Sequence, residues 1–114
     1  MTELTHLRAD GSAHMVDVTD KAVTRREARA QAVLQTRPDV VAMIADGTLP
    51  KGEALGTARI AGIMGAKQTS ALIPLCHPLP LSKVTVDLEP EEDRIRILAT
   101  AVTKGVTGVE MEAL

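Results

Sequence analysis

The pair Cys76-His77 joins a thiol and an imidazole, the side chains of this 114-residue chain best suited to nucleophilic or metal chemistry. It lies in the proline-bracketed segment IPLCHPLPLSKVTVDL, residues 73–88. A cysteine nucleophile and its base must lie within hydrogen-bond reach. Adjacent residues of an extended segment, however, point to opposite faces. The pair therefore does not predict a catalytic Cys–His dyad.

A zinc site at this pair would require two or three further cysteine or histidine ligands. Cys76 is the only cysteine, and the other histidines, His6 and His14, lie near the N-terminus. We therefore expect no metal site. Because buried cysteine commonly behaves as a small apolar residue, the chemistry falls to His77. Two interpretations of His77 stay open: a hydrogen-bonding or acid–base group, or a structural residue of the turn.

Basic residues offer a second kind of chemistry. Lys51 lies between Pro50 and Gly52, which favours a fixed direction for its side chain, although a solvated loop lysine is the alternative. Arg59 and Lys67 lie about two turns apart in one expected helix and therefore share a face. Such a face can bind phosphate, and ordinary solvation explains it equally well.

The C-terminal segment TGVEMEAL carries two carboxylates, Glu110 and Glu112. In a helix they point about 200° apart, so they do not form an acid–base pair. Thr107 and Glu110 match a capping box. Glu112 is then available to accept the N–H donors of a guanine or pterin ring. The basic groups and this one carboxylate together suit a phosphorylated heterocycle as ligand.

Composition narrows the function classes. The chain is one domain without Phe, Tyr or Trp, so it lacks the platforms on which single-stranded nucleic acids stack. A net charge of -2 gives no basic field for nucleic acid or membrane. One cysteine, no leader and no membrane-spanning stretch predict a cytoplasmic protein. A small core without aromatic residues favours a homo-oligomer.

The remaining segments must position these groups. We expect a flexible arm over residues 1–12, a domain over 13–114 with a short first strand over 13–20, and helices over 37–47 and 52–73. Alternating residues 84–88 and 95–99 predict a hairpin joined by EPEED, residues 89–93. Residues 24–35 are ambiguous, because their composition favours a helix and their alternation favours a strand. A helix begins at Thr107.

Three glycines interrupt the expected long helix: Gly56, Gly62 and Gly65. Each weakens a helix by about 1 kcal/mol relative to alanine. Their presence predicts close packing of the helix backbone on another element.

Three segments taken in order, HMVDVTDK, LPKGEALGTARIAGIMGAKQTSALIPLCHPLPLSKV and TGVEMEAL, resemble the MoaC family of molybdenum cofactor biosynthesis. The resemblance runs from about Thr5 to Leu114. It implies a ferredoxin-like α+β fold, an antiparallel sheet with helices packed on one face, here lacking the C-terminal helix and strand of the family. Under that fold residues 24–35 form a strand.

The resemblance also implies a reaction and an assembly. Family members convert (8S)-3',8-cyclo-7,8-dihydroguanosine 5'-triphosphate, a cyclised guanosine triphosphate, to cyclic pyranopterin monophosphate and release pyrophosphate, without a cofactor. They assemble as hexamers, trimers of dimers, with active sites at the dimer interface. The alternative is an inactive short homologue that binds substrate or serves as a structural subunit beside a full-length paralogue.

Transferred residue by residue, the resemblance implies a substrate pocket with two catalytic groups, Lys51 and His77. The implied substrate-binding residues fall into three sets: the pocket wall Leu75, Cys76 and His77, the contacts to the pterin or guanine ring Met111 and Glu112, and the phosphate contacts Arg26, Arg59 and Lys67.

Two departures from the family pattern matter. In the family the helix that TGVEMEAL opens continues and carries an Asp and a Lys central to catalysis, so we expect these 114 residues alone to be inactive. The family also has a basic residue just before TGVE. Here that position is Val106, with Lys104 two positions earlier, which puts a phosphate contact there in question.

Overall fold

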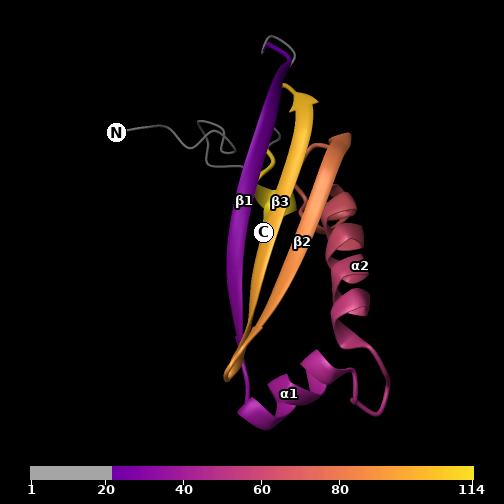
Figure 1. Ribbon diagram of the computed structural model, residues 1–114. Coiled ribbons are helices and arrows are strands. Elements are labelled where there is room, and N and C mark those ends of the chain that lie inside the picture. Colours follow the sequence, from indigo (N-terminus) through magenta and orange to yellow (C-terminus); the bar gives the residue numbers. More distant parts are fainter. Residues whose placement is uncertain (1–21) are drawn as a thin grey trace, which may run out of the picture.

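The computed structural model of the chain describes residues 22–114, whose three long strands form one antiparallel sheet with helices on one side (Figure 1). The strands are β1 (Thr24–Gln35), β2 (Leu81–Glu91) and β3 (Arg94–Gly105), in the order β1-β3-β2. The helices are α1 (Pro38–Asp46), α2 (Ala54–Lys67), α3 (Thr69–Leu72) and α4 (Glu110–Ala113). The predicted α+β class is confirmed. The arm over 1–12 and the strand over 13–20 lie outside the described residues.

The ambiguous segment 24–35 is a strand, so its alternation prevailed over its helix propensity. β1 pairs with β3 along its whole length, from Thr24 opposite Gly105 to Gln35 opposite Arg94. Ala28 and Ala30 pack against the core of the helix side. Helix propensity is a weak preference, and a continuous ladder to the central strand outweighs it.

The hairpin strands are confirmed, but the predicted connection is wrong. Residues 89–91 continue β2, so only Glu92 and Asp93 form the turn. Pro90 is tolerated within β2 because β2 is an edge strand. Arg96 donates hydrogen bonds of 3.2 Å from Nε and Nη2 to the Glu91 carboxylate. These bonds hold the pKa of Glu91 below its usual value, so the acidic segment is compatible with regular strand pairing.

The first helix follows its sequence signals. Pro38 begins α1, and Gly47 ends it with a φ of 70°, the left-handed conformation that favours glycine. The expected helix over 52–73 is instead two helices, because α2 ends at Lys67 and α3 begins at Thr69. The Thr69 hydroxyl donates to the carbonyls of Gly65 and Ala66 at 3.3 and 3.0 Å. It thus occupies carbonyls at the end of α2.

Of the three helical glycines, one makes the predicted close contact with the sheet. A Cβ atom at Gly62 would lie 3.0 Å from Cγ2 of the buried Val86 on β2. Gly65 has no atom within 4 Å of such a position, and at Gly56 a Cβ would meet the carboxylate of Glu53, which accepts a hydrogen bond from the Gly56 N–H. The backbone of α2 therefore approaches β2 at Gly62.

The core consists of small side chains, as a chain without aromatic residues requires. Ala101 of β3 is fully buried and packs with Val109 and Ala113. This cluster draws α4 against the central strand. No helix within residues 22–114 is long and apolar enough to cross a membrane.

Replacing Gly62 or Gly65 by alanine tests the contact between α2 and β2. Both changes give the helix-propensity gain of about 1 kcal/mol, so that gain cancels in their difference. Only Gly62→Ala forces a methyl group onto Val86. We expect Gly62→Ala to be less stable than Gly65→Ala by about 1–3 kcal/mol. Urea unfolding of the two variants measures this difference, and equal stabilisation by both would contradict the close approach.

Candidate active site

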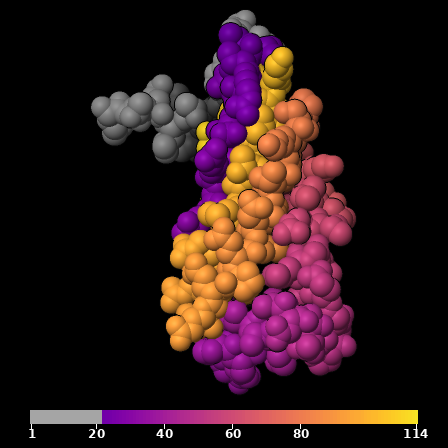
Figure 2. All heavy atoms as spheres, viewed as in Figure 1, coloured from indigo at the N-terminus to yellow at the C-terminus, as the bar shows by residue number. Residues whose placement is uncertain are grey.

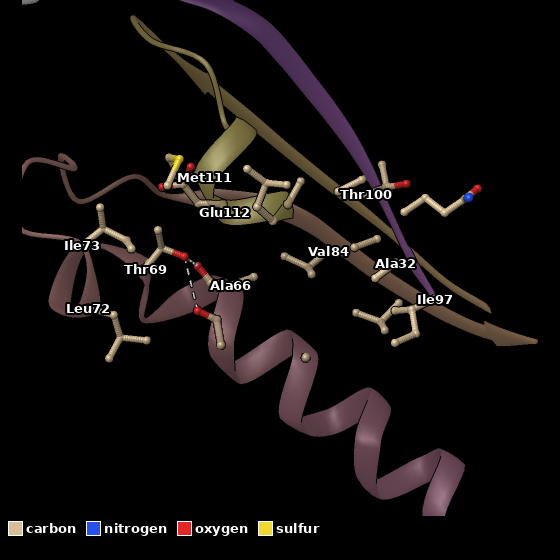
Figure 3. A pocket seen from close by; sticks show the side chains of 18 residues that line it. Ala32, Ala66, Thr69, Leu72, Ile73, Val84, Ile97, Thr100, Met111 and Glu112 are labelled. Atoms are coloured by element: carbon tan, nitrogen blue, oxygen red, sulfur yellow. Dashed lines mark hydrogen bonds between the residues drawn. The ribbon is translucent and has the colours of Figure 1, made fainter. Parts of the chain in front are cut away.

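An apolar groove runs along the helix side of the sheet (Figure 3). Its volume is about 460 Å³, and α2 and α3 form one wall, the strands the floor, and α4 one end. Small residues line its middle, among them Gly65 and Ala66 of α2 and Ala30 and Ala99 of the sheet. Met111 and Glu112 lie at the α4 end, facing Thr69 and Ile73. The groove is therefore apolar along its length, and the Glu112 carboxylate lies at its head, the end that α4 forms.

Helix α4 begins later than the sequence predicts. Its N-cap is Val109, with no side-chain cap hydrogen bond, so the capping box of Thr107 and Glu110 is wrong. Val109 is 1% exposed, and its burial against β3 sets the start of the helix. The Glu110 carboxylate instead lies beside Gly108, where a Cβ atom would meet it.

The two carboxylates of α4 occupy different environments. Glu110 is exposed, whereas Glu112 is 8% exposed and faces the groove. Within residues 22–114, Glu112 forms no hydrogen bond or ion pair. Burying a carboxylate without donors carries a large desolvation cost. Glu112 is therefore well suited to accept the N–H groups of a bound ring.

The segment that carries Cys76 and His77 meets α4 at this point. The pKa of the Cys76 thiol is raised, first by burial and second by the negative charge of Glu112. Cys76 is thus close enough to Glu112 to feel its charge, and burial and this charge both disfavour the thiolate. In the described part of the chain no hydrogen bond joins Cys76 to His77. Leu75, Cys76 and His77 are all partly exposed, as pocket-wall residues must be.

A residue that sequence reasoning missed holds this segment in place. Thr103 of β3 is fully buried, and its hydroxyl donates a 2.6 Å hydrogen bond to the carbonyl of Pro80. The bond ties the end of the proline-rich segment to the central strand. The sequence did contain a signal for this role. Thr103 alternates with Ala99 and Ala101 along the strand, so its hydroxyl side chain lies on the same inward face as those two alanines.

Arg26 lies at the same end of the sheet. It stands opposite Thr103, and Thr103 stands opposite Leu81. The Arg26 Nε donates to the carbonyl of Gly105 at 3.2 Å, on the path that leads into α4. This bond uses one nitrogen of the guanidinium, and within residues 22–114 Nη1 and Nη2 form no hydrogen bond.

The two cationic residues of α2, Arg59 and Lys67, lie in different turns of the helix. Arg59 donates from Nε to the carbonyl of Val86 at 3.0 Å, so its guanidinium lies against β2. Lys67 occupies the last turn of α2 and is exposed. Lys67 is thus at the end of α2 that adjoins α3 and the segment 73–80.

Lys51 lies at the opposite end of α2. It is exposed in the turn between α1 and α2, which a 2.8 Å hydrogen bond from Gly52 N to the Leu49 carbonyl closes. Helix α2 lies between the turn that carries Lys51 and the segment that carries Cys76 and His77 (Figure 1). Its 14 residues correspond to a helix length of roughly 20 Å. Within one chain, the structure therefore brings His77, Glu112 and Arg26 to one end and leaves Lys51 at the other.

No group of three or more His, Cys, Asp or Glu side chains in the described 93-residue range 22–114 is arranged to hold a metal ion. The polar groups near α4 are instead a carboxylate, an imidazole and a guanidinium. Such a set can bind an ionic, hydrogen-bonding organic ligand.

Comparison with known proteins identifies relatives of this arrangement. Residues 15–114 match the family model of the MoaC family. All 114 residues align with the cyclic pyranopterin monophosphate synthase of Corynebacterium efficiens at 64% identity and cover 74% of that protein. The protein of the same name from Corynebacterium glutamicum is 62% identical over 114 residues, which cover 73% of it, and that of strain R is 60% identical with the same coverage.

The proximity of Cys76 to Glu112 predicts a change in thiol reactivity. Because the Glu112 charge raises the thiol pKa, Glu112→Gln lowers that pKa and increases the thiolate fraction at a given pH. We expect iodoacetamide to alkylate Cys76 faster at pH 8, with the rate profile displaced to lower pH. The matched control Glu110→Gln changes an exposed carboxylate and leaves the profile unchanged. Identical profiles for both variants and the parent chain would contradict the placement of Cys76.

Proposed function

Since the chain belongs to the MoaC family, we propose that it acts as a cyclic pyranopterin monophosphate synthase in molybdenum cofactor biosynthesis. In this reaction a cyclised dihydroguanosine triphosphate rearranges to cyclic pyranopterin monophosphate and pyrophosphate leaves. The enzyme class is a lyase, and the proposal includes no cofactor and a cytoplasmic location.

The observation that carries this proposal is the buried Glu112 carboxylate at the head of the groove. A guanine or pterin ring presents adjacent N–H donors, which match the acceptor pair of a carboxylate. Met111, the neighbouring residue on α4, is exposed and lines the same groove. It supplies an apolar contact for the ring.

The neighbouring groups have distinct proposed roles. His77 contacts the substrate beside Leu75 and Cys76 and takes part in proton transfer. Arg26 and Lys67 bind the phosphates, and a fixed cation stabilises the charge that develops on departing pyrophosphate. Arg59 contributes through its remaining guanidinium nitrogens, because its Nε is engaged by Val86.

The position of Lys51 supports an oligomeric site. Within one chain the length of α2 separates Lys51 from His77, so a proton transfer between them through one substrate requires a second copy. We propose that the active site lies between two copies, one supplying His77 and the other Lys51. A hexamer built as a trimer of dimers is the proposed assembly.

A chimaera tests the proposed reaction directly. Residues 1–114 replace the aligned 114 residues of the Corynebacterium efficiens relative, to which they are 64% identical. We expect pyrophosphate release from the cyclised nucleotide at a rate within about tenfold of that relative. Lys51→Ala in the chimaera lowers kcat by at least about a hundredfold, whereas His77→Ala mainly raises KM. A folded chimaera without turnover would disprove the assignment.

Mixing two variants, assayed at substrate concentrations well below the parent KM where both have low activity, tests the shared site. Chimaeras carrying Lys51→Ala and His77→Ala are unfolded together in urea and refolded as mixed oligomers. If the two residues act across an interface, one of the two sites in each mixed dimer is intact, and activity returns to about a quarter of the parent value. Variants refolded separately and then combined are the control. No recovery after joint refolding would place both residues in one chain.

A further inference from the structure

Two inward residues of β3 hold the two sides of the candidate site. Ala101 packs against the cluster that keeps α4, and with it Glu112, on the sheet. Thr103 is the next inward residue, and its hydroxyl donates the 2.6 Å hydrogen bond to the carbonyl of Pro80. Successive residues on one face of a strand lie about 7 Å apart. A single strand therefore sets the separation between α4 and the segment that carries His77.

Strand β3 is a rigid support for both contacts. Figure 2 shows it between β1 and β2, and it pairs with both neighbours, so that Thr103 stands opposite Arg26 on one side and Leu81 on the other. Ladder hydrogen bonds along both edges hold its backbone. Because the Thr103 side chain is also fully buried, its hydroxyl has a fixed position relative to the whole sheet.

The segment from His77 to Pro80 is stiff along its own length. Pro78 and Pro80 each have a fixed φ, and the residue before a proline, here His77 and Leu79, is confined to extended conformations. Leu79 packs against the cluster that holds α4. Among residues 22–114, the bond from Thr103 is the single hydrogen bond that residues 77–80 form. A displacement at Pro80 is therefore carried along the segment to the imidazole.

A β-bulge marks the point at which this segment enters the sheet. Leu81 pairs with Thr103, whereas Lys83 pairs with Val102, so Ser82 is the extra residue. The Ser82 hydroxyl donates to the carbonyl of Val102 at 3.2 Å. Bulges are frequent beside active sites, where they change the direction of a side chain. The direction of residues 77–80 is thus determined where the Thr103 bond is made.

The hydroxyl of Thr103 is not required to fill space. A valine has nearly the same volume and would bury no polar atom, as the apolar Ala99 and Ala101 do on the same face. A buried hydroxyl that lost its acceptor would be costly. The hydroxyl therefore favours the one arrangement in which the Pro80 carbonyl lies against it.

We propose that Thr103 is a positioning residue, whose hydrogen bond to Pro80 holds His77 at the separation from Glu112 that a bound ring requires. This inference rests on the proposed function. Thr103 is fully buried and acts through His77 rather than on the substrate. Without the bond the imidazole is present but poorly placed, so the expected consequence is weaker substrate binding, as for loss of the imidazole itself.

Removing the hydroxyl in the chimaera tests this role. We expect Thr103→Val to raise KM about tenfold and to leave kcat within about threefold of the parent value. Thr103→Ser keeps the donor, so its KM should stay within about threefold of the parent. The double variant His77→Ala/Thr103→Val should have the KM of His77→Ala alone, because an absent imidazole cannot be displaced further.

The matched control is Thr85→Val. Thr85 lies on β2 on the outer face of the sheet, the side that faces away from α2 and α4, and its hydroxyl forms no hydrogen bond within the described range 22–114. This control should leave KM unchanged. An unchanged KM for Thr103→Val would overturn the proposal, as would a serine variant that behaves like the valine variant. Effects on KM that multiply in the double variant would assign Thr103 a role independent of His77.

Backbone ¹⁵N order parameters of the 114-residue chain give a second measurement, which does not depend on turnover. The amides of His77 and Leu79 should be as rigid as those of β3. In Thr103→Val they should fall below about 0.6, while residues 110–113 keep their values. Mobile amides in the parent, unchanged order in the variant, or a variant that does not fold would each overturn the proposal. If the parent chimaera lacks turnover, the proposed function fails, and the order parameters alone decide whether Thr103 holds His77.

Discussion

The packing of Val109 and Ala113 on Ala101 is the contact on which the candidate site depends. It holds a helix of four residues, α4, against the central strand, although an isolated helix of that length is not stable. Glu112 lies between these contacts and is buried with them. Because the side chains in this cluster are small, the helix lies near the strand and its carboxylate lies at the head of the groove.

Two further constraints bring the pocket wall to the same place. The hydrogen bond from Thr103 fixes Pro80 to β3. The close contact of α2 with β2 at Gly62 fixes the position of α2, and therefore the point at which α3 and the segment 73–80 begin. Cys76 then lies where the charge of Glu112 raises its pKa. The site is thus assembled from three segments that are distant in sequence, and each is held by a contact with the sheet.

Local signals were sufficient where a few residues determine the conformation. Pro38 and Gly47 bounded α1 correctly, and the alternation of residues 84–88 and 95–99 identified the hairpin. Local signals failed where tertiary contacts determine the conformation. The burial of Val109 moved the start of α4 away from Thr107, and two arginine–carboxylate pairs allowed β2 to continue through the acidic segment. The separation of Lys51 from His77 depends on the direction of α2, which no local pattern encodes.

The central claim is that α4 and the segment around His77 form the ligand-binding end of the molecule. Amide chemical-shift mapping of the chain with the cyclised dihydroguanosine triphosphate tests it most directly. The account predicts that the largest shifts cluster at residues 75–77 and 110–113, and that Glu112→Gln reduces them while Glu110→Gln does not. Shifts confined to α1, to the Lys51 turn or to the outer face of the sheet would contradict it.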